Sequence, residues 1–305
     1  MTVNKLTEDE IELSIIILSY NTEALTRQTI ESIYQSTRLT SEKFEIIALD
    51  NASTDESVPM LKKLEKHHPN LHVIESKENT GFSKGNNLAS KQAKGTYLLF
   101  LNSDIIVHKK GIDNLLTYLK THTNTAHFVG GKLLNQDTSD QASCGPFYTL
   151  PVVFGALFLR GDYWGLTRYS PEQIKRVDWV SGACMLTKKE YFEKTGGFDE
   201  GIFMYMEEID LLYRAKKQGY HTYFVPEGRF THLGSASSGG KTYPILQVYK
   251  GFLYFYKKHY SPGAVTVLKG MLQLKARIAI LLGKLTGKNY LIETYGKAQE
   301  IASMA

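Results

Sequence analysis

TYLLFLNSDIIV, residues 96–107, contains an apolar run, Tyr97 to Leu101, that stops abruptly at Asn102-Ser103-Asp104. A continuous apolar run closed by polar residues is typical of a central parallel strand that is buried on both faces. Open α/β sheets bind their ligands just beyond the carboxyl ends of such strands. Asp104 is therefore placed where a carboxylate can meet a divalent cation and the phosphates it carries. The same residue types dominate turns, and taken alone the stretch leaves both interpretations open.

The segments on either side repeat the pattern of an apolar strand followed by a helical period. Strands are expected at residues 14–18, 44–49, 71–74 and 126–130, and helices at 23–36, 56–67, 79–93 and 110–122. Strands that alternate with helices in this way predict β-α-β units and a mostly parallel sheet with right-handed crossovers. Residues 131–176 lose this regularity, and long irregular segments are often binding loops or lids.

Three strand ends place polar residues at the same edge of the expected sheet: 19–22, 50–55 and 102–104. Asp50 can accept a hydrogen bond from a base N–H or a ribose hydroxyl, and it lies too far upstream to cap the next helix. For Asp55, helix capping and ligand binding both remain open. The first strand is followed by no G-x-G-x-x-G, and the chain contains no G-x-x-x-x-G-K-[ST]. These absences argue against a dinucleotide-binding dehydrogenase and a P-loop enzyme.

The composition is that of an ordinary globular chain of 305 residues, 42% hydrophobic and 22% charged. A net charge of +5 suits a phosphate-rich ligand or an anionic membrane surface, but is too small to indicate nucleic acid. Cys144 and Cys184 lack metal-ligand spacing, which favours a reducing cytosol. The polar, acidic start of the chain is unlike a signal peptide, and no apolar run approaches the roughly 20 residues of a spanning helix. We therefore expect a soluble protein or one that lies on a membrane without crossing it.

The second half adds a candidate base and a candidate metal ligand. A strand is expected at 177–186, a short helix at 188–195, and a further helix that starts near Glu207. In that helix Asp210 and Arg214 are spaced i,i+4 and should pair. Glu207 and Glu208 fall in the first turn, where the helix dipole favours anions, but one of them could instead point into the cleft as a general base. After an expected strand at 220–226, His232 lies on a Gly/Ser-rich loop, a credible ligand position.

Together these motifs resemble family 2 inverting glycosyltransferases of the GT-A fold. The nearest subgroup is the bacterial dTDP-rhamnosyltransferases of cell-wall and surface-polysaccharide assembly, and the resemblance covers about residues 13–260. The motifs that carry it are, in order, SIIILSYN, LDNASTD, ENTGFSKGNN, LNSD, WVSGACML, GGFDE, FMYMEEIDLLYR and THLGSASSG. The resemblance implies an α/β fold with a mostly parallel Rossmann-like sheet flanked by helices and a C-terminal helical appendage.

The resemblance also implies roles for single residues. Asp104 and His232 would hold Mg2+ or Mn2+, and Glu208 would be the catalytic base, with Glu207 and Asp210 beside it. Trp179, Gly182 and Arg214 would contact the acceptor. The residues implied in nucleotide-sugar binding are Ser19, Asn21, Asp50, Asn79, Gly81, Lys84, Asn102, Ser103 and Asp104.

Two departures from the family pattern affect the site. Asn102 stands at the first position of the D-x-D-like motif, so metal ligation rests on Asp104 and His232. The acidic pair is Glu207-Glu208, which makes the base a glutamate. The division of the acids fits the chemistry, because inverting transfer needs one carboxylate to take the acceptor's proton and a cation to offset charge on the departing diphosphate. A retaining glycosidase would instead need two carboxylates about 5 Å apart around the bond.

The tail predicts a contact surface. Residues 243–260 are aromatic and basic, and 264–285 plot as an amphipathic helix with a basic polar face and Lys275 on its apolar side. Such a helix can lie on anionic lipid, or it can dock on the catalytic domain or on a second subunit in a homodimer. We therefore expect a catalytic domain at 1–242, with a nucleotide-sugar half at 13–130 and an acceptor half at 131–242, followed by a helical region at 243–305.

The sequence thus predicts a metal-dependent inverting transferase that moves L-rhamnose from dTDP-rhamnose to a polyprenyl-diphosphate-linked or polysaccharide acceptor. It would act in the cytoplasm, at the inner face of the cell membrane. A UDP-sugar such as UDP-GlcNAc or UDP-galactose is the alternative donor. A sugar-1-phosphate nucleotidyltransferase would need a Gly-rich, Arg-containing loop after the first strand, and Ser19-Tyr20-Asn21 is not one. A carbohydrate-binding protein without catalysis is the more distant alternative.

Overall fold

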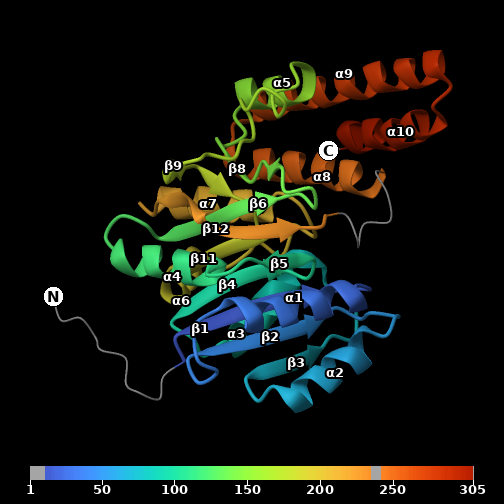
Figure 1. Cartoon of the computed structure of the whole chain (residues 1–305). Helices are drawn as coiled ribbons and strands as arrows, with labels where there is room; N and C mark the ends of the chain where they lie inside the picture. Colours follow the sequence, from blue (N-terminus) through green and yellow to red (C-terminus); the bar gives the residue numbers. More distant parts are fainter. Residues whose placement is uncertain (1–10, 235–241, 305) are drawn as a thin grey trace.

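The first half of the chain forms the parallel part of a central sheet (Figure 1). The computed structural model describes residues 11–234 and 242–304, so the acidic start of the chain and most of the Gly/Ser-rich loop after His232 lie outside the described residues. The expected strands and helices are confirmed to within two residues at each end. They are β1 (Leu13–Ser19), α1 (Glu23–Ser36), β2 (Phe44–Asp50), α2 (Ser57–His67), β3 (Leu71–Glu75), α3 (Gly81–Gln92) and β4 (Tyr97–Asn102).

The strand β4 lies at the centre of this sheet, as its apolar run predicts. The strand order is β3-β2-β1-β4-β11-β6-β12-β5, and β4 is parallel to β1 on one side. Its side chains enter two different cores, because successive residues of a strand point to opposite faces. Phe100 packs against Phe192 and Phe198 on one face, and Leu99 and Leu101 are buried on the other.

The second half of the chain makes the sheet mixed. Its elements are β5 (Ile105–Val107), α4 (Gly111–Thr121), β6 (Phe128–Leu134), β7 (Asp140–Gln141), β8 (Cys144–Gly145), α5 (Leu150–Phe158), β9 (Lys175–Val177), β10 (Trp179–Val180), β11 (Cys184–Lys188), α6 (Lys189–Thr195), α7 (Glu207–Lys217) and β12 (Thr222–His232). The strand β11 runs antiparallel to both β4 and β6, whereas β12 runs parallel to β6.

Three predictions for this half were wrong. The strand expected at 220–226 continues as β12 to His232, so His232 ends a strand and does not lie on the loop after it. The single strand expected at 177–186 is three short strands, because the chain turns at Ser181, whose carbonyl oxygen accepts a hydrogen bond from Cys184 N at 3.2 Å. The segment 131–176 is also more regular than expected, since β6 continues to Leu134 and α5 forms within it. The apolar sequence of α5 did not alternate or show a clear helical period, which is why it was not recognised.

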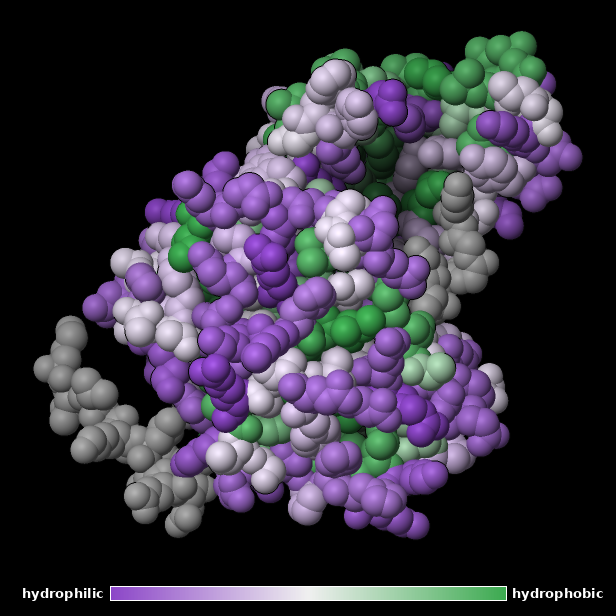
Figure 2. Space-filling model, in the orientation of Figure 1, coloured by the Kyte–Doolittle hydropathy of each residue, from purple (hydrophilic) through white to green (hydrophobic). Residues whose placement is uncertain are grey.

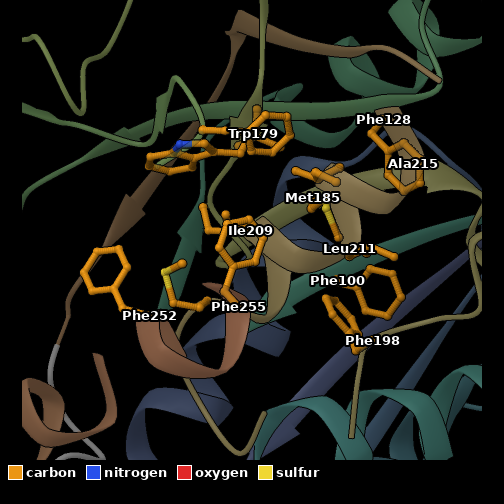
Figure 3. Close-up of a cluster of buried hydrophobic side chains, with 14 of the residues drawn as sticks. Phe100, Phe128, Trp179, Met185, Phe198, Ile209, Leu211, Ala215, Phe252 and Phe255 are labelled. Carbon is orange, nitrogen blue, oxygen red and sulfur yellow. The ribbon is translucent and has the colours of Figure 1, made fainter. Parts of the chain in front are cut away.

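Three further helices complete the chain: α8 (Thr242–His259), α9 (Pro262–Thr286) and α10 (Asn289–Met304). They gather with α5 at one end of the molecule, while β3 and α2 lie at the other (Figure 1). Phe252 and Phe255 of α8 lie in the same buried cluster as Trp179 and as Ile209 of α7 (Figure 3). The core therefore continues from the sheet into the C-terminal helices. Within the described part of the chain, no helix is long and apolar enough to cross a membrane.

Candidate active site

A cavity of about 620 Å³ lies at the carboxyl ends of the central strands. The end of β4, the segment before α7, the turn after β10 and the end of β12 all contribute to its wall. Among the described residues, its charged or titratable lining consists of Asp104, Arg168, Glu207, Glu208 and His232, together with several tyrosines. Asp104 and the pair Glu207-Glu208, about a hundred residues apart in the sequence, therefore line the same cavity, as the motifs predict.

Asp104 and His232 meet because two strands pair. The short strand β5 follows Asp104 directly and is antiparallel to β12, with Ile105 opposite His232. Leu233 N donates to the Asp104 carbonyl at 3.0 Å and closes this pairing. As a result, Asp104 Oδ1 lies 3.3 Å from His232 Nε2, and Asn102 Nδ2 lies 3.4 Å from the same nitrogen. Gln141 Oε1 lies 2.6 Å from His232 Nδ1 and fixes the ring from behind.

These side chains fit a divalent cation that also binds a ligand. No cluster of three or more His, Cys, Asp or Glu side chains suited to a metal occurs in the described ranges. One carboxylate and one imidazole leave most positions around a Mg2+ or Mn2+ ion open, and such ions are often held by one or two protein groups plus phosphate oxygens. The site thus has the donor set of a cation that completes its coordination with a diphosphate.

Asn79 and Gly81 line the same cavity next to Asn51, a residue that the sequence motifs did not single out. Asn51 Nδ2 donates to Asn79 Oδ1 at 3.0 Å, and Asn51 Oδ1 accepts from Thr80 N at 2.9 Å. This network ties the end of β2 to the start of α3. Gly81 has φ +77°, and a Cβ there would lie 2.6 Å from the Phe203 carbonyl oxygen. Only glycine fits this position, because an L side chain would meet both strain and a clash.

Four of the residues expected at the nucleotide are not among those that line the cavity. Ser19 is buried and hydrogen-bonded to Thr26 Oγ1 at 3.0 Å, and Asn21 Oδ1 accepts from Thr54 N at 2.7 Å. Asp50 Oδ1 accepts from Ser53 N at 2.8 Å. Lys84 faces Glu78 at 3.6 Å. The contacts of Ser19, Asn21 and Asp50 hold the loops that follow β1 and β2, and Tyr20, Thr22 and Asn51 from these loops line the cavity instead.

Asp50 differs from the other three in one respect. Its Oδ2 atom is buried and has no hydrogen-bond partner among the described atoms, although the residue is only 1% exposed. A buried oxygen of this kind normally has a hydrogen-bond partner.

Asp55, for which capping and ligand binding were both open, accepts from Ser57 N at 3.0 Å at the start of α2 and from Glu23 N at 3.2 Å at the start of α1. It therefore stabilises the starts of two helices.

The two glutamates enter the cavity from the first turn of α7. Tyr205 and Met206, directly before this helix, have φ values of 65° and 78°. Two successive non-glycine residues in the left-handed region are costly, and such strain persists only where the surroundings enforce it. The strained bend turns the N-terminus of α7 toward the cavity. Glu207 and Glu208 both line it, and the Oε2 atom of each is buried without a hydrogen-bond partner among the described atoms.

Burial raises the pKa of both glutamates, but not equally. For Glu207, burial and then the neighbouring charge of Glu208 hold the pKa well above its usual value. For Glu208, burial also raises the pKa, while hydrogen bonds from the backbone of Glu208, Gly182 and Ile209 and the charge of Arg168 oppose that effect. The Arg168 charge and these backbone hydrogen bonds favour the ionised form of Glu208, which is the form that a general base requires.

Asp210 and Arg214, which the sequence assigned to catalysis and to the acceptor, lie outside the cavity. Asp210 is completely buried, and its carboxylate accepts from Arg214 Nε at 2.7 Å, Lys258 Nζ at 2.9 Å and His259 Nε2 at 2.7 Å. Arg214 also donates to the carbonyl oxygens of Thr195 and Gly197. The expected pairing of Asp210 with Arg214 is confirmed, and its partners explain why neither side chain is free to contact a substrate.

The environment of Asp210 predicts a pH-dependent loss of stability. Burial alone would raise its pKa, but His259, Arg214 and Lys258 outweigh burial and lower the pKa from 3.8 to about 2. The stabilisation is complete above the unfolded value and is lost as pH falls toward 2. Asp210→Asn should lower the free energy of unfolding at neutral pH by about 2–4 kcal/mol, because it removes the buried carboxylate that accepts from Arg214, Lys258 and His259.

Thermal and urea denaturation at neutral pH and at about pH 3 would measure this effect, which should shrink in acid. Asp137→Asn, on an exposed turn, is the matched control and should change stability by less than about 0.5 kcal/mol. Equal stability of Asp210→Asn and the unsubstituted chain at neutral pH would contradict the role of this cluster.

The remaining wall of the cavity is aromatic and carries one cation. Trp179 is buried, donates from Nε1 to the Pro146 carbonyl at 2.8 Å and stacks with Tyr148. Gly182 faces Glu208, whose Cβ would lie 3.6 Å from an added Cβ. Arg168 lies 5.7 Å from the centre of the Trp179 ring and donates to the Ala142 carbonyl at 3.1 Å. Its buried Nε has no hydrogen-bond partner within the described ranges. Arg168 and Tyr148 lie in the aperiodic segment, where sequence pattern gave no signal for them.

The sequence is similar to those of known sugar transferases. Rhamnosyltransferase WbbL of Escherichia coli strain K12 is 30% identical over 230 residues, which cover 72% of this chain and 82% of that protein. The N-acetylglucosaminyl-diphospho-decaprenol L-rhamnosyltransferase of Mycobacterium tuberculosis is 27% identical over 213 residues, 64% of this chain and 68% of that protein. The hexosyltransferase Agl10 of Haloferax volcanii is 29% identical over 212 residues, but the match spans only 62% of its length.

The fold has solved counterparts as well. The mannosyltransferase PcManGT of Pyrobaculum calidifontis, solved with GDP-Man and Mn2+, superposes with a TM-score of 0.59 at 16% identity, covering 97% of this chain and 76% of that one. Residues 14–196, more than half of the chain, match the family described as glycosyl transferase family 2. The mixed sheet, its cavity at the strand ends and these matches show that the chain belongs to glycosyl transferase family 2 and has the GT-A fold.

Proposed function

We propose that this protein is an inverting glycosyltransferase that transfers L-rhamnose from dTDP-rhamnose to an acceptor hydroxyl. One observation carries the proposal: the Asp104–His232 pair and the carboxylate of Glu208 line one cavity large enough for a nucleotide sugar. Single displacement needs these two functions in one site and no second carboxylate as a nucleophile. The names of the Escherichia coli and Mycobacterium tuberculosis relatives support rhamnose as the sugar.

In this mechanism each part of the cavity has one task. Asn51, Asn79 and the backbone at Gly81 would position the nucleotide, and Asp104 and His232 would hold Mn2+ or Mg2+. When bound, the cation would offset the charge that grows on the departing diphosphate. Glu208 accepts the proton of the acceptor hydroxyl as that oxygen attacks the anomeric carbon. Burial and the charge of Glu208 raise the pKa of Glu207, which disfavours a second negative charge beside the base.

The acceptor end of the cavity favours a phosphorylated acceptor. Arg168 brings the one guanidinium of the described cavity wall to within 5.7 Å of the Trp179 ring, and its buried Nε lacks a partner. Arginine is well suited to phosphate. A sugar linked through diphosphate to a polyprenyl lipid offers that group, and the Mycobacterium tuberculosis relative is named for such an acceptor. Such an acceptor would bring the protein to the cytoplasmic face of the membrane.

A donor and acceptor screen tests this proposal. The purified chain with Mn2+ or Mg2+ would be offered dTDP-rhamnose, UDP-GlcNAc or UDP-galactose, with N-acetylglucosamine either free or linked through diphosphate to a short polyprenol. We expect nucleoside diphosphate release from dTDP-rhamnose, at a higher kcat/KM with the diphosphate-linked acceptor, and a product of inverted anomeric configuration by NMR. Faster release of UDP from a UDP-sugar would identify that sugar nucleotide, and not dTDP-rhamnose, as the donor. Sugar binding without release of nucleoside diphosphate from any donor would favour a carbohydrate-binding protein.

A further inference from the structure

Hydrophobic side chains are exposed on one end of the molecule, far from the strand β3 (Figure 2). Most of the large hydrophobic side chains exposed in the described part of the chain belong to two segments, α5 with the loop after it and α9. They are Phe154, Leu159, Tyr163, Trp164 and Leu166 in the first, and Val267, Leu274, Ile278, Leu281, Leu282 and Leu285 in the second. We call these eleven residues the apolar face. A contiguous apolar surface on a folded protein usually marks an interaction site.

The helix α9 has two apolar sides, only one of which the fold uses. Leu268, Leu272 and Ala276 are buried, where α9 packs against α8 and α10. Val267, Leu274, Ile278, Leu281 and Leu285 recur at intervals of seven, four, three and four residues, so they form a stripe on a different side of the helix. The amphipathic arc predicted from the sequence is therefore split. Lys275, predicted on the apolar side, donates to the Leu157 carbonyl at 2.8 Å and ties α9 to α5.

The charge beside the apolar face is entirely positive on α9. The helix contains Lys269, Lys275, Arg277 and Lys284 and no Asp or Glu. Arg277 and Lys284 are exposed, and a spacing of seven residues puts both on the same border of the stripe. In the other segment Arg160 lies 4.9 Å over the Tyr163 ring, and the only carboxylate between residues 150 and 168, Asp162, accepts a hydrogen bond from Thr167.

We propose that the apolar face binds the surface of an anionic lipid bilayer, with the axis of α9 in the plane of the membrane. Interfacial helices combine an apolar side with flanking Lys and Arg, and Trp and Tyr prefer the headgroup region. Trp164 is 67% exposed and lies beside Tyr163, an arrangement that suits the headgroup region of a bilayer. A second copy of the chain is a poorer occupant, because α9 against α9 would bring Arg277 and Lys284 near their own counterparts without a carboxylate on either helix.

Binding of the full chain to vesicles without donor or acceptor lipid tests this proposal separately from the transfer reaction. We expect co-sedimentation with phosphatidylglycerol-containing vesicles, and much weaker co-sedimentation with pure phosphatidylcholine. Leu274→Gln/Leu281→Gln/Leu285→Gln and Arg277→Gln/Lys284→Gln should each weaken the partition coefficient roughly tenfold or more. The control Lys63→Gln/Lys66→Gln removes the same charge from exposed positions of α2, at the other end of the molecule, and should bind like the unsubstituted chain.

Tryptophan fluorescence gives an independent measurement. The chain contains two tryptophans, and Trp179 is buried in the cavity wall. A blue shift on addition of anionic vesicles should therefore come from Trp164 and disappear in Trp164→Phe. Circular dichroism and thermal melting would verify that each variant is folded. Unchanged vesicle binding by the triple leucine variant would overturn the proposal. So would a dimer in lipid-free solution that this variant converts to a monomer, since the face would then be a subunit interface.

Discussion

Glu208→Gln should reduce kcat for sugar transfer by roughly 10²–10⁴-fold while leaving donor binding close to that of the unsubstituted chain. The substitution keeps the shape of the side chain but removes the basic oxygen that accepts the acceptor's proton. The donor contacts at Asn51, Asn79 and Asp104 are not altered. Single-turnover kinetics and calorimetric titration of dTDP or the intact donor would separate the two effects.

The pH profile provides a second test of the same assignment. Because burial raises the pKa of Glu208, kcat/KM should fall as pH drops through a value above 4.5, the ordinary pKa of a glutamate side chain. The base must be ionised to act, so the loss occurs on the acid side. Glu193→Gln, on an exposed part of α6, should leave unchanged both the rate at neutral pH and the fall of kcat/KM on the acid side. If Glu208→Gln retained normal turnover, the base would have to be another residue.

Asp104→Asn should remove metal-dependent turnover, with a fall in kcat/KM on the order of 10²–10⁴-fold. The amide is nearly the same size, but it lacks the negative charge that binds a hard cation, and Asn102 already supplies an amide beside it. Of the proposed pair of ligands, His232, whose Nε2 lies 3.3 Å from the Asp104 carboxylate, would then remain. Mn2+ binding, measured by electron paramagnetic resonance in the presence of dTDP, should weaken in parallel with activity.

The controls for Asp104→Asn separate metal binding from folding. Asp137→Asn removes a carboxylate from an exposed turn and should leave Mn2+ affinity and turnover unchanged. His232→Gln should also weaken Mn2+ binding, and more than it weakens Mg2+ binding, because imidazole nitrogen suits the transition ion better. Full activity of Asp104→Asn in a chelator-treated assay would show that the reaction does not depend on this pair.

The parts of the fold and site that the sequence predicts are those decided by local pattern. The buried run of β4 and the polar residues after it located Asp104, and the acidic start of α7 located Glu208. The meeting of Asp104 with His232 depends on the β5–β12 register, which is set by residues more than a hundred positions apart. Family resemblance supplied that pairing, whereas periodicity could not.

The residues that were assigned wrongly or missed share a physical reason. Asp210 looks like a third catalytic acid in the sequence, but Lys258 and His259, which bind it, come from the end of α8, nearly fifty residues away. Arg168 lies in a segment without hydrophobic period, and only the folded chain places it over Trp179. The break at Ser181 was also not predicted, because the apolar residues on either side continue a strand pattern across Gly182 and Ala183, two residue types of low strand propensity.

The hydrogen bonds of Lys258 and His259 to Asp210 have a practical consequence for work with the enzyme. Asp210 is two positions after Glu208 on α7. Its contacts with the end of α8 therefore help to fix the position of Glu208, the proposed proton acceptor. A shortened protein ending at residue 242 would lose this anchor along with Phe252 and Phe255, and we expect it to be inert even with water-soluble substrates. Tags and fusion partners should therefore be attached at the amino terminus, so that they do not disturb α8 or the helices that pack on it.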